Sequence, residues 1–162
     1  KIMGVDLSEK MLAVAAEKVR RKGLDDHIAL YQGDAEQLDV ADGVLDVVTV
    51  AFGVRNFGNL EQGLSEIMRS LRSGGHIVVL EFSTPRNWLV RKCYQFYSNH
   101  VMKPVGGMVS KDRKAYDYLP DSIVEFPDRE RFLDIMPRTG FVECRRFSQS
   151  FGIAQIYIGK KA

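Results

Sequence analysis

Three polar side chains stand where apolar runs of this chain end, and each suits a ligand. Asp6 closes the first run, Asp34 follows the second, and Arg55 follows the third. If these runs are strands of an open α/β sheet, their carboxyl ends form the edge at which such sheets bind ligands. A carboxylate there can accept two hydrogen bonds from a vicinal diol, as in the ribose of a nucleotide cofactor. Asp6 is therefore predicted to hold a ribose, with a cap interaction beside Ser8 as the alternative.

The other two positions suggest contacts to a base and to a second substrate. Asp34 can take the exocyclic amine of adenine while the N–H of Ala35 meets a ring nitrogen, although an Asx turn explains the same residues. Arg55 and Asn56 suit an anionic or enolic oxygen, and a structural ion pair of Arg55 with a helix-terminal carboxylate is the alternative. Glu81 lies deep in a later apolar run, where an unpaired carboxylate is costly. It is predicted to fasten a neighbouring loop or helix.

The composition is that of one cytoplasmic domain. The 162 residues are 45% apolar and 27% charged, as in ordinary globular proteins. With 23 basic and 21 acidic residues the formal net charge is +2, which gives no sign of nucleic-acid binding. Cys93 and Cys144 lack metal or redox spacing, and the histidines do too, so we expect reduced thiols and no metal. No apolar stretch is long enough to cross a membrane.

The elements that must position these residues follow from apolar periodicity. Strands are predicted at 1–6, 28–31, 44–51 and 76–83, with helices at 8–22 and 60–71 between them. Such alternation indicates a parallel sheet with right-handed crossovers. The second half predicts a helix at about 87–102, a break at 104–107, a helix capped by Asp128 that ends at Gly140, and strands at 141–148 and 153–160. The last two form a hairpin that adds an antiparallel strand.

Taken in order, the motifs of the chain are more specific than any one of them. The segments G-V-D-L-S, G-D-A-E-Q-L, V-A-F-G-V-R-N-F, L-E-F-S and Y-L-P-D-S-I resemble those of the ubiquinone/menaquinone biosynthesis C-methyltransferases, a family of class I S-adenosylmethionine-dependent methyltransferases. The resemblance implies a Rossmann-like, mostly parallel α/β sheet in the order 3-2-1-4-5-7-6 with an antiparallel last strand. The chain is expected to begin at strand 2, as the carboxyl-terminal part of a single methyltransferase domain over 1–162. The amino-terminal arm and the glycine-rich motif are absent from it, so residues 1–162 alone are predicted to lack a complete cofactor pocket.

The resemblance also implies an activity and a set of site residues. The activity is C-methylation of a prenylated quinol by S-adenosyl-L-methionine, and the closing strand favours the menaquinone over the ubiquinone pathway. The implied cofactor contacts are Asp6, Asp34, Ala35 and Ala51, and the implied catalytic residues are Arg55 and Asn56. Ala51 replaces a serine of some relatives, so it can offer only its backbone. The base stays open among Tyr97, His100 and water.

The aromatic and basic segment 85–121 is predicted to be a lid over the ring and the prenyl tail, with a core-packing helix as the alternative. Its lysines and arginines suit a peripheral contact at the inner face of a membrane, and a solvated basic face explains them equally well. A homodimer stays open as well. Two other functions remain: methylation of another small hydrophobic acceptor, and a methyltransferase-like scaffold without activity.

Overall fold

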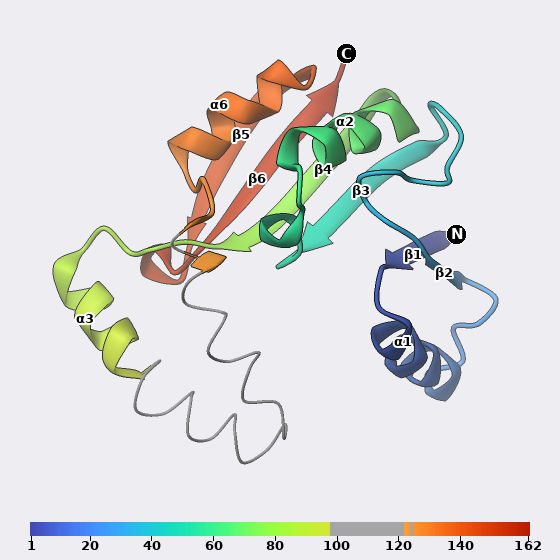
Figure 1. The fold of residues 1–162 in the computed structure, drawn as a ribbon, viewed down its shortest axis with the longest axis horizontal. Coiled ribbons are helices and arrows are strands. Elements are labelled where there is room, and N and C mark those ends of the chain that lie inside the picture. Colours follow the sequence, from blue (N-terminus) through green and yellow to red (C-terminus); the bar gives the residue numbers. More distant parts are fainter. Residues whose placement is uncertain (98–121, 124) are drawn as a thin grey trace.

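The structure is a computed structural model that describes residues 1–97, 122–123 and 125–162 (Figure 1). Strands and helices alternate through the first half, in the order β1 (Ile2–Asp6), α1 (Glu9–Arg21), β2 (Ile28–Gln32), β3 (Leu45–Ala51), η1 (Val54–Asn56), α2 (Leu60–Ser70) and β4 (Leu71–Phe82). The second half contains α3 (Trp88–Tyr97), α6 (Glu130–Arg138), β5 (Phe141–Gln149), η3 (Ser150–Gly152) and β6 (Ala154–Lys161). The predicted alternation of strands and helices is confirmed.

The strands form two separate sheets. β1 and β2 pair in parallel, and a four-stranded sheet has the order β3-β4-β6-β5. In the larger sheet β3 and β4 are parallel, whereas β6 runs antiparallel to both of its neighbours. The predicted closing hairpin and antiparallel last strand are therefore confirmed. The single, mostly parallel sheet is found only in part, because β1 and β3 belong to different sheets.

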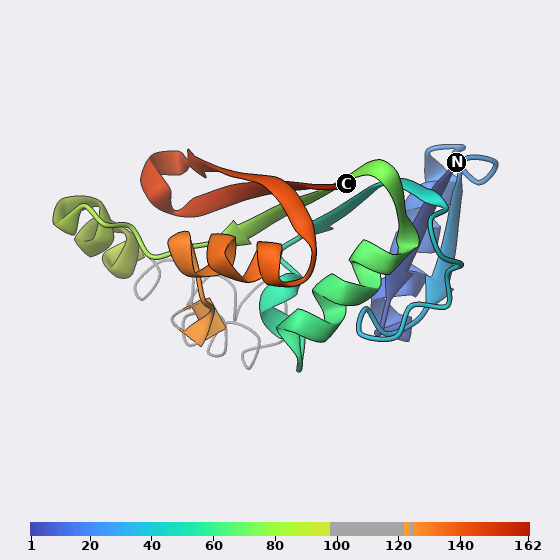
Figure 2. The same ribbon diagram turned by 90° about the horizontal axis from the view of Figure 1, so that it is seen from above.

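The hydrophobic core lies between the four-stranded sheet and two helices. α2 and α6 cover the same face of this sheet (Figure 2), and their apolar residues recur at helical spacing, which gives each helix one buried side. The fully buried side chains of this core include Leu64, Ile67, Leu71, Ile77, Val79, Phe132, Met136 and Tyr157. By contrast, no residue between positions 1 and 53 is buried. The β1–α1–β2 unit thus contains no buried residue, and the buried core belongs to the larger sheet and the helices that cover it.

The start of β4 differs from the prediction. Helix α2 ends at Ser70 and the strand begins at Leu71, five residues earlier than predicted. Leu45 pairs with Leu71 but Val47 pairs with His76, so the strand contains a bulge. Gly74 has a φ of +78°, which allows the chain to turn inside the bulge. Gly74 and Gly75, which lie between the helix predicted at 60–71 and the strand predicted at 76–83, are therefore part of the strand.

Two further differences concern helices. α6 begins after Arg129 and has no side-chain cap, so the prediction that Asp128 caps it is wrong. The Asp128 carboxylate instead accepts hydrogen bonds from Ser83 Oγ at 2.6 Å and from Thr84 N at 3.3 Å. α3 agrees with the start of the helix predicted at 87–102. The rest of that helix, the break at 104–107 and most of the lid lie outside the described residues.

Candidate active site

Asp6 lies at the tip of β1 and takes part in the cap of α1. Its Oδ1 accepts a hydrogen bond from Ser8 N at 2.8 Å, and Ser8 Oγ accepts one from Met11 N at 3.3 Å. The predicted cap interaction is therefore present. Asp6 remains exposed and borders a cavity of about 220 Å³ between β1 and α1. Neither Asp34 nor Ala35 lines that cavity, so the structure does not unite the cofactor candidates in one pocket.

Asp34 forms the predicted Asx turn just beyond β2. Its Oδ1 accepts a hydrogen bond from Glu36 N at 2.8 Å, and the side chain is exposed. Gly33 N donates to the backbone oxygen of Asp6 at 3.2 Å, so the tips of β1 and β2 are directly adjacent. The two carboxylates therefore stand at neighbouring strand ends, each with one oxygen committed to a local turn.

Glu36 joins this edge to the loop that follows β3. Its Oε1 accepts a hydrogen bond from Gly58 N at 2.6 Å, and its backbone oxygen accepts one from Gln62 Nε2 at 3.3 Å. These bonds connect the Asp34 turn to the 52–58 loop across the boundary between the two sheets. The strand-end segments that carry Asp6, Asp34 and Arg55 thus form one continuous rim.

Arg55 and Glu81 form a buried ion pair at this rim. Arg55 Nη1 donates to Glu81 Oε1 and to the backbone oxygen of Phe52, both at 2.6 Å, and Arg55 N donates to Glu81 Oε2 at 3.3 Å. The side chain of Glu81 is 0% exposed and that of Arg55 is 11% exposed. The prediction that Glu81 fastens a loop is confirmed. The ion pair that was the alternative role of Arg55 is also present, and the partner is this strand carboxylate.

Part of the Arg55 guanidinium keeps unused donor capacity. Nε is buried, and no described residue accepts a hydrogen bond from it. The guanidinium lies 5.6 Å from the centre of the Phe82 ring, and the Phe52 ring stacks on that ring at 4.3 Å. Phe52 has a φ of +57°, a strained value for a bulky residue and one that is often found at functional sites. The strand tips therefore combine a cation with an aromatic platform.

Tyr94 on α3 lies close enough to Arg55 to feel its charge. Burial raises the pKa of the Tyr94 hydroxyl, and the positive charge of Arg55 opposes that rise. Helix α3, which forms the first part of the segment predicted to be a lid, therefore lies near Arg55. The other base candidates lie outside the described parts, because the side chain of Tyr97 and all of His100 are not placed.

The remaining predicted residues occupy the same loop. Ala51 is the last residue of β3, and Asn56 is exposed while its N–H donates to the backbone oxygen of Gly53 at 3.0 Å. The Phe57 ring ends the loop by packing on the backbone of α2 at Gly63, where a side-chain carbon would overlap it. The loop is therefore held by a carboxylate at one end and by helix packing at the other.

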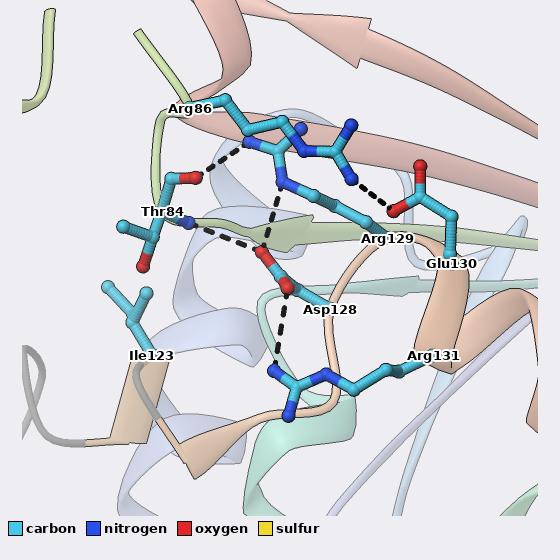
Figure 3. Close-up of a pocket in the computed structure, with 7 residues that line it drawn as sticks. All are labelled: Thr84, Arg86, Ile123, Asp128, Arg129, Glu130 and Arg131. Atoms are coloured by element: carbon cyan, nitrogen blue, oxygen red, sulfur yellow. Dashed lines mark hydrogen bonds and ion pairs between the residues drawn. The ribbon is translucent and has the colours of Figure 1, made fainter. Parts of the chain in front are cut away.

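A second polar cluster, around Arg129, was missed by the sequence reasoning (Figure 3). It surrounds a cavity of about 380 Å³ lined by Thr84, Arg86, Ile123, Asp128, Arg129, Glu130 and Arg131. Arg129 Nη2 donates to Thr84 O at 2.7 Å and to Gly152 O at 3.2 Å, and Arg86 pairs with Glu130 at 2.9 Å. Because its charges pair with one another, we interpret the cluster as a clasp between the end of β4 and α6. The alternating charges at 128–131 are the sequence signal that could have indicated it.

Two classes of feature are not found in the described parts of the chain. Within residues 1–97, 122–123 and 125–162, no three His, Cys, Asp or Glu side chains gather as metal ligands would. In the same residues no helix has the length and apolar character needed to cross a membrane.

Comparison with known proteins agrees with the resemblance of the motifs. The chain is 40% identical over 160 residues to the demethylmenaquinone methyltransferase of Bacteroides fragilis, and this match covers 99% of the chain and 65% of that relative. It is 44% identical to the ubiquinone/menaquinone biosynthesis C-methyltransferase UbiE of Geobacter sulfurreducens, again over 99% of the chain and 62% of the relative. The chain thus spans a little under two thirds of the length of these relatives.

Solved structures show the fold. A protein from Methanococcus maripaludis that is assigned as an S-adenosyl-L-methionine-dependent methyltransferase superposes with a TM-score of 0.67 at 19% identity, over 99% of this chain and 66% of the other. This likeness shows the mixed α/β fold of such methyltransferases. Residues 1–161 match the profile of the ubiE/COQ5 methyltransferase family, and the chain therefore belongs to that family.

Proposed function

We propose that the protein is an S-adenosylmethionine-dependent methyltransferase that transfers a methyl group to a ring carbon of a prenylated quinol. The observation that carries the proposal is the continuous rim of strand-end loops in a chain of this family, with two carboxylates at one end and Arg55 beside an aromatic platform at the other. The first end suits a nucleoside and the second suits a flat, anionic ring.

The residues at the first end fit the cofactor. Asp6 and Asp34 are exposed at adjacent strand tips, and each uses only Oδ1 in its local turn, which leaves a carboxylate oxygen to accept further hydrogen bonds. Asp6 would hold the ribose hydroxyls, Asp34 and the N–H of Ala35 would hold the adenine, and the backbone of Ala51 would border the methionine part. When bound there, the cofactor supplies an electrophilic methyl group.

The residues at the second end fit the acceptor. A quinol ring carbon becomes nucleophilic when the neighbouring hydroxyl loses its proton, and negative charge then develops on that oxygen. Arginine stays protonated in proteins, so Arg55 would stabilise this charge rather than remove the proton. The amide of Asn56, which is exposed, would assist at the same oxygen. Desolvation and alignment between the Phe52–Phe82 platform and the cofactor would supply much of the rate.

We further infer that the two sheets are parts of one methyltransferase sheet within a single domain. The orders β1-β2 and β3-β4-β6-β5 fit the family order 3-2-1-4-5-7-6 when one position is left between β1 and β3. Both strands that would flank this position carry exposed apolar side chains, such as Ile2 and Val47. A further strand in that position would cover them and complete the glycine-rich side of the cofactor site.

The substrate branch and the cellular location are also part of the proposal. We prefer menaquinone biosynthesis, and the ubiquinone pathway is the second candidate, because the relatives include a demethylmenaquinone methyltransferase and a ubiquinone/menaquinone biosynthesis C-methyltransferase. α3 exposes Trp88 and Leu89, and Lys92 lies 5.3 Å from the Trp88 ring. This mixture of apolar and basic side chains supports a cytoplasmic protein that contacts the inner face of a membrane through the lid segment. A homodimer stays a proposal without a supporting contact.

A labelled-methyl assay tests the proposal. The protein, expressed at its natural length, is incubated with methyl-labelled S-adenosylmethionine and either reduced demethylmenaquinone or a ubiquinone-pathway quinol, both with short prenyl tails. We expect label in the quinol ring, more of it with the first substrate. Menaquinol, whose reacting carbon already carries a methyl group, is the negative control. A folded protein that binds the cofactor but labels neither quinol would overturn the assignment.

A further inference from the structure

We propose that Glu81 is a positioning residue of the methyl-acceptor site, which holds Arg55 and the 52–56 loop in the orientation that the acceptor oxygen requires. This inference rests on the proposed function. Glu81 is the second-to-last residue of β4, next to the strand tip, and its side chain is completely buried. It does not reach the rim itself, so any effect on the reaction must pass through the groups that it binds.

The carboxylate of Glu81 fixes the loop at two levels. Oε2 accepts the backbone N–H of Arg55 at 3.3 Å, and Oε1 accepts the guanidinium Nη1 at 2.6 Å. Oε1 also accepts the N–H of Phe82 at 2.9 Å, which fixes the rotamer of the carboxylate relative to its own strand. The Glu81 carboxylate thus binds both the backbone and the side chain of Arg55, and these two contacts fix the direction of the guanidinium.

The bonds to Nη1 decide which donors stay available. Glu81 and the backbone oxygen of Phe52 both bind Nη1, each at 2.6 Å, whereas Nε has no acceptor among the described residues. The arginine is therefore held by one corner. Its buried Nε is left without an acceptor among the described residues, and the guanidinium lies 5.6 Å from the centre of the Phe82 ring.

A purely structural role explains this arrangement less well. A buried ion pair contributes little net stability, because the desolvation of both charges offsets their attraction, and apolar replacements are often neutral. The hydrogen bonds of Glu81 go to the Arg55 loop and to Phe82, and none goes to α2 or α6, which form the core. The charge thus serves the loop rather than the packing of the helices.

The chain contains a matched control pair. Glu66 and Arg69 also form a carboxylate–guanidinium pair, with 2.9 Å between Oε2 and Nη2, and both are partly buried. This pair lies on α2: Glu66 accepts a hydrogen bond from Leu38 N, Arg69 donates to the backbone oxygens of Leu38 and Val40, and neither residue binds the 52–58 loop. Neutralising Glu66 removes the same kind of charge pair without releasing Arg55.

The first test compares Glu81→Gln with Glu66→Gln in the protein at its natural length. Glutamine keeps the shape of the side chain and an acceptor oxygen but loses the charge. We expect Glu81→Gln to lower kcat about 10²-fold, the usual effect of misplacing a reacting group by about 1 Å, while the Kd of S-adenosylmethionine stays within a few-fold. Glu66→Gln should keep kcat within about twofold, as expected for a group remote from the reaction. A Glu81→Gln enzyme that folds and keeps wild-type kcat would overturn the inference.

The second test asks whether Glu81 acts through Arg55. If it does, Glu81→Gln should cause no further loss of kcat in an Arg55→Ala background, because the group that it positions is gone. Independent, multiplicative losses would refute the positioning role. If Glu81→Gln does not fold, Glu81→Asp keeps the charge but shortens the reach, and it should also lower kcat with unchanged cofactor affinity; normal kcat in that variant counts against the inference.

An activity-independent measurement separates this inference from the proposed function. The Nε–H of Arg55, assigned by its loss in Arg55→Ala, should give a slowly exchanging NMR signal in the wild type. The signal should broaden or exchange quickly in Glu81→Gln and persist in Glu66→Gln. If neither quinol is a substrate but this pattern holds, the proposed function fails while the orientation of Arg55 by Glu81 stands. An unchanged Arg55 signal in Glu81→Gln would refute the inference whatever the substrate is.

Discussion

Arg55 and Arg129 are both largely buried arginines near the end of β4, yet their hydrogen bonds differ in kind. Arg129 binds the backbone oxygens of Thr84 and Gly152, and its own N–H donates to Tyr157 Oη at 2.6 Å. Arg55 Nη1 donates to one buried carboxylate and one backbone oxygen, and no described residue accepts a hydrogen bond from Arg55 Nε. Burial and pairing alone therefore do not separate Arg55, for which we propose a role in the reaction, from Arg129; the feature that differs is the Nε of Arg55, which has no acceptor among the described residues and lies beside two aromatic rings.

The largest expected effect is that of Arg55→Ala on turnover. Loss of one oxyanion partner should lower kcat roughly 10²–10³-fold, while the Kd of S-adenosylmethionine stays within a few-fold. Arg55→Lys should recover only part of the activity, because a point charge does not replace the planar guanidinium. Steady-state kinetics and calorimetry measure both quantities. If Arg55→Ala instead lowers the melting temperature while the folded fraction keeps near-normal turnover, Arg55 has a structural role like that of Arg129, and the proposed difference between the two arginines is wrong.

Arg129→Ala should show the opposite pattern. It leaves Asp128 without its buried neighbour and frees two backbone acceptors, so the free energy of unfolding should fall by about 3 kcal/mol. The folded fraction should keep its turnover. Arg131→Ala is the control, since that side chain is 66% exposed and its loss should change stability by less than about 0.5 kcal/mol. Urea unfolding measures the stability, and the activity per folded molecule measures the turnover. A loss of kcat in Arg129→Ala without a loss of stability would contradict the prediction.

Asp6→Ala tests the other end of the rim. Losing a charged hydrogen-bond acceptor should weaken S-adenosylmethionine binding by about 1.5–3 kcal/mol, with a much smaller effect on kcat at saturating cofactor. Isothermal calorimetry with the natural-length protein measures the change. Ser8→Ala removes the α1 cap without touching the Asp6 carboxylate and serves as the control. Unchanged affinity in Asp6→Ala would leave the carboxylate with only its cap role.

The smallest effect concerns the Arg129 clasp at high pH. Burial raises the pKa of Tyr157 to about 12, above its value in the unfolded chain. Below pH 10 the hydroxyl is protonated in both the folded and the unfolded chain, so its contribution to the free energy of unfolding is fully present. This contribution is lost as the pH rises from about 10 to 12. Between pH 10 and pH 12 the free energy of unfolding of the wild type should therefore fall by about 1–2 kcal/mol more than that of Tyr157→Phe. A difference between wild type and variant that stays constant across this window would contradict the assignment.

The sequence predicted the helices and strands better than the contacts between them. β3 and α2 were foreseeable because a β-branched run and an apolar helical stripe leave few alternatives. The need of Glu81 for a partner was also foreseeable. That the partner is Arg55, 26 positions earlier, depends on the parallel register that sets Ala51 beside Leu80, which no local pattern encodes.

The wrong predictions share a cause. Asp128 has the sequence of a helix cap, but its carboxylate accepts hydrogen bonds from Ser83 and Thr84, which directly follow β4. The Gly-Gly pair at 74–75 has the chemistry of a helix stop, yet pairing with β3 extends the strand back to Leu71. In both cases a tertiary partner competed with the local preference and won. The Arg129 clasp was missed for the same reason, because Arg129 Nη2 donates to the backbone oxygens of Thr84 and Gly152, which are distant in the sequence.

Gly63 gives this fold a limit that matters for engineering. A glycine inside a helix is an obvious target for thermostabilisation, since alanine usually gains about 1 kcal/mol there. In α2, however, a methyl group at this position would occupy the space of the Phe57 ring, and Phe57 ends the loop that carries Arg55. Gly63→Ala would therefore displace Phe57 and with it the loop that carries Arg55, so a substitution that favours the helix would disturb the loop for which we propose a role in the reaction.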